Sequence, residues 1–246
     1  MSILVFTGPT LSESDVRAVL DAEVLPPVAQ GDVLRAAARR PAVIGIVDGY
    51  FDTLPAVWHK EILWALREGI AVYGSASMGA LRAAELSAFG MRGVGAIFEA
   101  YASGSLEDDD EVALVHGPPD SGYRALSVPM VDVRATLAAA ADAGVVTAAT
   151  RDRLVALVKA LFYPDRDYRR MLADGKAAGV PAGELEALAA WLPSGRRSAK
   201  RGDALAMLEA IRSRNDARDE TVSRFDGPRF HFEETSYWSA LEGESR

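Results

Sequence analysis

One serine of this sequence lies in a segment typical of a catalytic nucleophile. Residues 75–79 read Ser-Ala-Ser-Met-Gly, the small-x-Ser-x-small spacing of a nucleophile elbow, with Ser75 in place of the usual first glycine. In an elbow, a sharp strand-to-helix turn presents the serine hydroxyl, and the next amide, here that of Met78, can bind an oxyanion. The small neighbour Gly79 avoids clashes on such a turn. This spacing indicates acyl transfer at Ser77.

The same segment has two other interpretations. Glycine and serine also suit a tight strand-to-helix connection in which Ser77 caps the helix and does no chemistry. Amides at a helix start can hold a phosphate as well, but neither Gly-Lys-Ser/Thr nor GxGxxG accompanies the segment. The sequence leaves the nucleophile and the structural turn both open.

A serine nucleophile needs a base, and the chain has three histidines, His59, His116 and His231. Helical spacing puts His59 on the apolar face of a predicted helix, which predicts a buried imidazole facing the sheet. His116 gives the order Ser77, Asp109, His116, which is the nucleophile, acid and base order of α/β-hydrolases. His231 lies between two phenylalanines and is interpreted as structural.

Arg82 and the acidic turn at 107–111 are further candidates. Arg82 can pair with Glu85 three residues later, or it can bind a substrate carboxylate. The turn is interpreted as solvated, although it could orient a base or bind a partner. No spacing of histidines or carboxylates predicts a metal site, and no cofactor motif is present.

The elements that position these residues repeat as strand, turn and helix. Apolar runs predict strands at residues 3–6, 42–47 and 70–73, and amphipathic segments predict helices at about 54–68 and 78–86. Strands that are apolar throughout are buried on both faces. We therefore expect an α/β fold with a Rossmann-like parallel sheet and flanking helices.

In such a sheet, the loops at the carboxyl ends of the strands form the ligand crevice. The segments 8–10, 48–51 and 75–79 should therefore meet at one edge. The substrate-binding or oxyanion residues predicted there are Gly8, Thr10, Asp48, Gly49, Met78, Gly79 and Arg82.

The later sequence changes character. Residues 112–115 are interpreted as a possible strand, and alanine-rich stretches from Val131 onward predict successive helices. The predicted organisation is an α/β core over 1–130, a helical region over 131–225 and a tail over 226–246. The basic run at 196–201 is interpreted as a solvated loop.

Composition excludes several classes of function. A net charge of −8 argues against nucleic-acid or anionic-membrane binding. The absence of cysteine excludes a persulfide, a disulfide or a cysteine nucleophile on this chain. The apolar start reaches Gly8-Pro9 too soon for a signal peptide, so a cytoplasmic location is expected.

Four stretches, spread over roughly residues 40–135, resemble the core of TfuA-like proteins. They are Asp48-Gly49-Tyr50-Phe51, the run from Pro55 to Leu63, the run from Tyr73 to Leu86 with Gly90-Met91, and the run from Asp109 to Ala113. The string Ser-Met-Gly-Ala-Leu-Arg-Ala at 77–83 is the most specific part.

This resemblance implies a role beside a YcaO enzyme, which uses ATP to activate a peptide amide during thioamidation of a ribosomally made peptide. Without cysteine, sulfur would come from an external donor, for which a thiocarboxylated ubiquitin-like sulfur-carrier protein is the natural candidate. Ser77 would attack the thiocarboxyl carbon, and His59 or His116 would move the proton. The Met78 amide, with one near Gly8 or Gly49, would hold the oxyanion.

Two rival functions stay open. One is a non-catalytic adaptor that recruits the YcaO enzyme and the sulfur donor. The other is an unrelated serine hydrolase or peptidase, which would turn over ordinary esters or peptides without a partner.

Overall fold

The computed structural model describes residues 2–216 and 232. The chain divides into two compact units. Unit 1 comprises Met1–Glu107 with Arg201–Arg246, and unit 2 comprises Asp108–Lys200. The predicted tail at 226–246, with His231, lies outside the described residues except for Phe232. No helix in the described ranges is long and apolar enough to cross a membrane.

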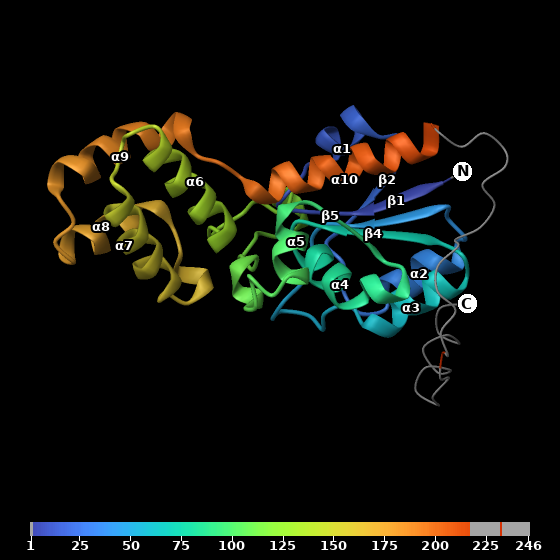
Figure 1. The fold of residues 1–246 in the computed structure, drawn as a ribbon. Helices are drawn as coiled ribbons and strands as arrows, with labels where there is room; N and C mark the ends of the chain where they lie inside the picture. Colours follow the sequence, from blue (N-terminus) through green and yellow to red (C-terminus); the bar gives the residue numbers. More distant parts are fainter. Residues whose placement is uncertain (1, 217–231, 233–246) are drawn as a thin grey trace. The chain divides into compact units, whose positions relative to one another are not determined.

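Unit 1 contains a five-stranded parallel sheet in the order β2-β1-β3-β4-β5 (Figure 1). The strands are β1 (Ile3–Phe6), β2 (Glu23–Leu25), β3 (Val43–Ile46), β4 (Ala71–Ser75) and β5 (Arg92–Val94). The predicted α/β class is therefore confirmed. The strand order is that of flavodoxin-like doubly wound sheets, in which the chain reverses direction between β1 and β3.

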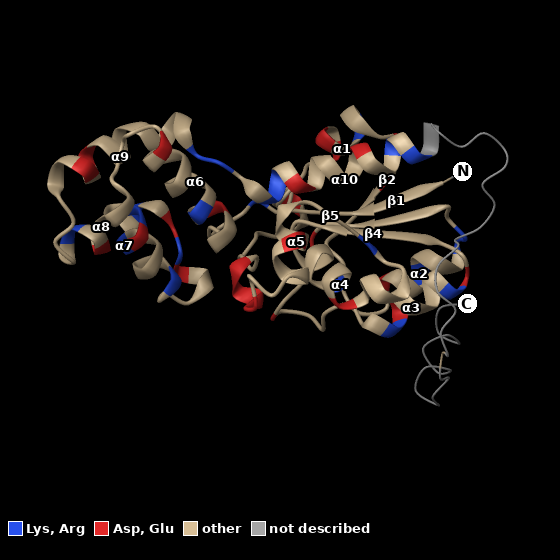
Figure 2. Cartoon of the chain, viewed as in Figure 1, with Lys and Arg blue, Asp and Glu red and all other residues tan. Residues whose placement is uncertain are grey.

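Helices cover both faces of this sheet. On one face lie α2 (Asp32–Ala38), α3 (His59–Arg67) and α4 (Met78–Leu86), followed by a 3₁₀ helix (Ser87–Phe89) and α5 (Ala96–Ala102). On the other lie α1 (Glu13–Val19) and part of α10 (Ala199–Asp216). Figure 2 shows that the strands are largely free of charged residues, as burial on both faces requires.

The helix α10 closes the second face of the sheet although it lies about a hundred residues beyond β5 in the sequence. Its residues Met207, Leu208 and Ile211 are buried and pack with Val5 and Tyr73. Because α10 packs on this apolar face, unit 1 includes residues that precede unit 2 in the sequence and residues that follow it. Unit 2 therefore runs from Asp108 to Lys200, whereas the helical region predicted from the sequence ran from 131 to 225.

One ion pair joins α1 to α10. The two terminal guanidinium nitrogens of Arg201 each lie 2.8 Å from a carboxylate oxygen of Asp15. The hydrogen bonds from Arg201 and Ser12 hold the pKa of Asp15 well below its usual range. The basic run at 196–201 is an exposed loop, as predicted, only over residues 196–198, because α10 begins at Ala199. Lys200 is buried and donates to the Val112 carbonyl at 3.1 Å.

Replacing Arg201 with methionine should lower the free energy of unfolding by about 0.5–1 kcal/mol at neutral pH, the usual range for a partly exposed pair. A lowered folded-state pKa stabilises the fold above the unfolded pKa, near 4 for Asp, and this contribution fades as the pH falls below it. Urea titrations from pH 7 to pH 3 should show the difference between wild type and variant begin to shrink below about pH 4, with part of it left at pH 3 because the folded-state pKa is well below 4. A difference that stays constant down to pH 3 would contradict the assignment.

Unit 2 is helical, with α6 (Met130–Asp142), α7 (Ala148–Lys159), α8 (Tyr168–Ala177) and α9 (Ala182–Gly195) around an apolar core. Three 3₁₀ helices accompany them, Asp109–Glu111, Pro119–Ser121 and Tyr163–Asp165. The strand predicted at 112–115 does not form. The sequence pattern was misleading because Val112 and Ala113 are buried as an irregular segment after the first 3₁₀ helix.

The acidic turn is exposed, as predicted, only over residues 107–109. Asp110 and Glu111 form ion pairs with Lys159, and Asp110 also pairs with Arg166, which is almost fully buried. Glu111 receives two further hydrogen bonds from Arg134, at 2.9 and 2.8 Å. The turn thus stabilises unit 2 internally.

Candidate functional site

The connection between β4 and α4 is a strained turn. The Ser77 amide donates to the Ser75 carbonyl at 2.7 Å, which closes a three-residue γ-turn around Ala76. Ala76 has φ of +65° and is fully buried. Positive φ at a non-glycine residue is costly, and γ-turns of this hand are rare and strained. The strand, sharp turn and helix that an elbow requires are therefore present at Ser77.

Two glycines let α4 begin directly over the ends of β3 and β4. A Cβ on Gly79 would lie 1.8 Å from the Ile46 carbonyl oxygen, and one on Gly74 would lie 2.1 Å from the Gly79 carbonyl oxygen. The Gly79 amide donates to Val47 at 3.2 Å. Gly79 therefore positions the turn, and its own amide is already used.

The Ser77 side chain is buried and makes no hydrogen bond to the described residues. The residue is 2% exposed, and none of the hydrogen bonds within the described ranges uses its hydroxyl. In particular, the hydroxyl does not cap α4. The amide of Met78, the first residue of α4, likewise has no acceptor in the described part of the chain. Buried polar groups are almost always satisfied, so this pair of groups is typical of a ligand site.

Asp48, at the carboxyl end of β3, organises the neighbouring loop. Its carboxylate accepts from the Gly8 and Thr10 amides at 2.9 and 3.0 Å and from the hydroxyls of Thr7 and Thr10 at 3.3 and 2.6 Å. The predicted segments 8–10 and 48–51 therefore do meet. However, the Gly8 amide is occupied by Asp48, which argues against Gly8 as an oxyanion donor.

With Gly8 excluded, Gly49 is the remaining candidate for a second oxyanion donor beside the Met78 amide. The peptide segment around it pairs with Val28, through the Val28 amide to Asp48 and the Tyr50 amide to Val28. The Gly49 amide itself has no acceptor among the residues described. A Cβ on Gly49 would lie 2.8 Å from the Met78 Cβ, so the two backbones pack together. This juxtaposition puts amides from the β3 and β4 loops in one region.

His59 is not the buried residue that its helical spacing predicted. Its side chain is 49% exposed, because α3 begins at His59 and not at about residue 54, so His59 lies at the open end of the helix. Its Nε2 lies 2.7 Å from Glu85 Oε2, which also accepts from Arg82 at 2.7 Å. Arg82 additionally donates to the Val57 carbonyl at 3.0 Å. The Arg82–Glu85 pair thus forms, and Arg82 also secures the loop before α3.

The other base and acid candidates are not hydrogen bonded to Ser77. Glu85 follows Ser77 by eight residues, about 12 Å along α4. His116 and Asp109 belong to unit 2, where Nδ1 of His116 lies 2.9 Å from the Gly117 carbonyl oxygen and Asp109 is exposed.

Glu61 has a structural role. It is buried and accepts from the amides of Gly31 and Trp58 at 2.8 and 3.2 Å. Burial raises the pKa of Glu61, while these amide hydrogen bonds oppose the rise. Glu61 therefore joins the starts of α2 and α3 and is not placed to orient a histidine.

The string Ser-Met-Gly-Ala-Leu-Arg-Ala therefore starts at the strained turn and continues as the first two turns of α4. Residues 48–167 match the TfuA-like protein family. This TfuA-like region begins at Asp48 and includes Ser77, His59 and His116, whereas Gly8 and Thr10 precede it. The resemblance stated from the sequence is thus confirmed, and the match extends further toward the C-terminus than residue 135. No curated protein matches the chain.

Two features of the candidate site escaped the sequence. Thr7 shares the Asp48 carboxylate, and it follows a buried strand, which is a usable signal. The positive φ of Ala76 has no signal, because alanine normally avoids that conformation.

Proposed function

We propose that this protein works beside a YcaO enzyme in the backbone thioamidation of a ribosomally made peptide. In this proposal it releases sulfide from a thiocarboxylated, ubiquitin-like sulfur-carrier protein and delivers it to the YcaO partner. The family match supports the pathway. The observation that carries the chemistry is the buried, unpaired Ser77 hydroxyl on a strained turn beside the unpaired Met78 amide, as far as the described residues go.

The reaction proposed is hydrolysis of the carrier's thiocarboxylate in two steps. Ser77 Oγ attacks the thiocarboxyl carbon, and the Met78 amide, with that of Gly49, stabilises the oxyanion. Collapse breaks the C–S bond and gives an acyl-serine and hydrosulfide, which takes the serine proton. Water then cleaves the acyl-serine to a carboxylate and regenerates Ser77. No cysteine is needed, consistent with a chain that has none.

His59 is the base that we assign, because it shares unit 1 with Ser77. For His59 to act as the base, the hydrogen bond between its Nε2 and Glu85 must break when the substrate complex forms. Catalytic hydrogen bonds often tighten only when substrate binds. His116, whose chain order matches the hydrolases, is the alternative.

Replacing His59 with alanine should lower the rate of sulfide release by about 10²–10⁴, the usual contribution of a general base. His116→Ala is the matched control and should retain the wild-type rate. The rate is measured as sulfide released from the thiocarboxylated carrier at fixed pH. The reverse pattern would assign the base to His116.

A non-catalytic adaptor is the second candidate function. It is favoured by the lack of a hydrogen-bonded base at Ser77 among the described residues and by the exposed, hydrogen-bonded side chains of His59 and Glu85, which could serve as a docking contact. In that case Ser77 and His59 variants keep thioamidation, whereas surface changes abolish it.

Mass spectrometry of the thiocarboxylated carrier distinguishes the two. The full chain is mixed with the carrier without any YcaO protein, and the carrier terminus is followed over time. We expect conversion to carboxylate with loss of sulfur. A carrier that stays thiocarboxylated alone and changes only when the YcaO partner is added would favour the adaptor.

A further inference from the structure

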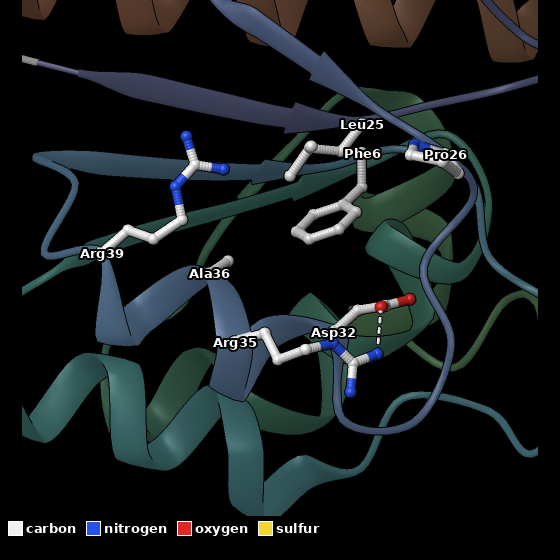
Figure 3. Close-up of a pocket in the computed structure, with 7 residues that line it drawn as sticks. All are labelled: Phe6, Leu25, Pro26, Asp32, Arg35, Ala36 and Arg39. Carbon is white, nitrogen blue, oxygen red and sulfur yellow. Dashed lines mark hydrogen bonds and ion pairs between the residues drawn. The ribbon is translucent and has the colours of Figure 1, made fainter. Parts of the chain in front are cut away.

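A cavity of about 200 Å³ lies in unit 1 between the ends of β1 and β2 and the helix α2 (Figure 3). Phe6 and Leu25 are the last residues of these two strands and are paired in the sheet register. Ala36 faces the Phe6 ring from α2. The walls nearest the sheet are therefore apolar.

The opposite wall of this cavity is charged. Asp32, Arg35 and Arg39 line it and are spaced by three and four residues, which puts them on one face of α2. Figure 3 shows the two arginine side chains extending on either side of Ala36. Each guanidinium has one carboxylate partner at present, Asp32 for Arg35 and Glu23 for Arg39, so the lining presents two positive groups only where these pairs open.

The present partners of both arginines are exchangeable. Arg35 Nη2 lies 2.6 Å from Asp32 Oδ1, and its side chain is 59% exposed. Arg39 pairs with Glu23, and both side chains are 49% exposed. Exposed ion pairs contribute little to stability, so a ligand carboxylate can replace either partner at small cost. Asp32 also accepts from the Ala29 amide at 2.7 Å, which keeps it satisfied if Arg35 moves.

We propose that this cavity binds a small monocarboxylate whose body is apolar, with the carboxylate between Arg35 and Arg39 and the body against Phe6 and Leu25. Guanidiniums recognise carboxylates through two parallel hydrogen bonds. The cavity is smaller than ordinary cofactor sites, which run from about 300 to 1,000 Å³, so its ligand is a short aliphatic or aromatic acid. The acid can be free or can be the last residue of a polypeptide.

This cavity is separate from the elbow. Phe6 ends β1 and Ser75 ends β4, with β3 between these strands, so the strand axes lie about 10 Å apart. Both sites are at the carboxyl edge of the sheet, where ligands of doubly wound folds bind. The proposal therefore does not depend on a catalytic Ser77.

Isothermal titration calorimetry with the full chain tests the proposal, using 3-phenylpropionate and its uncharged amide as the matched pair. We expect the acid to bind and the amide to bind at least about tenfold more weakly, as loss of a charge-assisted contact implies. Arg35→Met and Arg39→Met should each weaken acid binding by about tenfold. Arg212→Met, an exposed arginine of α10 outside the cavity, is the control.

A second pair of probes separates the two sources of the acid. N-acetyl-Ala-Phe carries a free C-terminal carboxylate, and N-acetyl-Ala-Phe amide does not. Binding of this peptide acid supports a polypeptide terminus as ligand, whereas binding of 3-phenylpropionate alone supports a free acid. The proposal is overturned if acids and amides bind alike, if the arginine variants match Arg212→Met, or if no acid binds at about 10 mM.

Discussion

Ser77→Ala is expected to reduce sulfide release from a thiocarboxylated carrier by a factor on the order of 10³ or more, because removing a serine nucleophile typically has effects of at least this size. The substitution should not lower the stability of the fold. The Ser77 hydroxyl is buried without a hydrogen bond to the described residues, so exchanging it for hydrogen removes an unsatisfied polar group. We therefore expect a thermal midpoint equal to or above that of the wild type.

Ser75→Ala is the control, since both serines belong to the same turn. The Ser75 hydroxyl donates to the Val94 carbonyl at 2.8 Å, and its loss should cost about 1 kcal/mol of stability while sulfide release persists. Ser77→Ala should thus lose activity and keep stability, whereas Ser75→Ala should lose stability and keep activity. Sulfide release that is unchanged in Ser77→Ala would reassign Ser77 to turn geometry and favour the adaptor function.

Gly79→Ala should destabilise unit 1 by about 3 kcal/mol or more, measured by guanidinium chloride unfolding. The new Cβ would lie 1.8 Å from the Ile46 carbonyl oxygen and 2.6 Å from its carbon, so the backbone itself must move. Because Gly79 follows Ser77 by two residues, this movement should displace the elbow and also reduce sulfide release.

Gly202→Ala is the matched control for that substitution. Gly202 lies in α10, where an added Cβ would meet no described atom within 4 Å. An alanine there should stabilise the helix by up to about 1 kcal/mol. If Gly79→Ala unfolded at the same denaturant concentration as the wild type, the close approach of α4 to β3 would not hold in solution.

The sequence predicted the central strands because each is a continuous apolar run. It missed β2 and β5, which are three residues long and carry exposed Glu23 and Arg92 at their starts, so neither gives a strand pattern. It also predicted a strand at 112–115 from valines that form no strand. An apolar run therefore predicts burial more reliably than it predicts a strand.

At the candidate site, the spacing of residues 75–79 determined the strand, turn and helix at Ser77. Local spacing works here because small residues and a helix start are properties of adjacent positions. The same reasoning failed for His59, whose helical face predicted burial. Exposure of His59 depends on where α3 begins. The loop before α3 is held by a hydrogen bond from Arg82 to the Val57 carbonyl, and the sequence does not show this contact.

The sequence by itself therefore determined the α/β class, the elbow segment and the resemblance to TfuA-like proteins, all of which rest on neighbouring residues. Only the tertiary structure decided that α10 covers the second face of the sheet, that Asp48 occupies the Gly8 amide, and that Arg35 and Arg39 line a cavity. Each of these depends on residues distant in the chain, whose meeting is fixed by packing and strand order, and no local pattern encodes it.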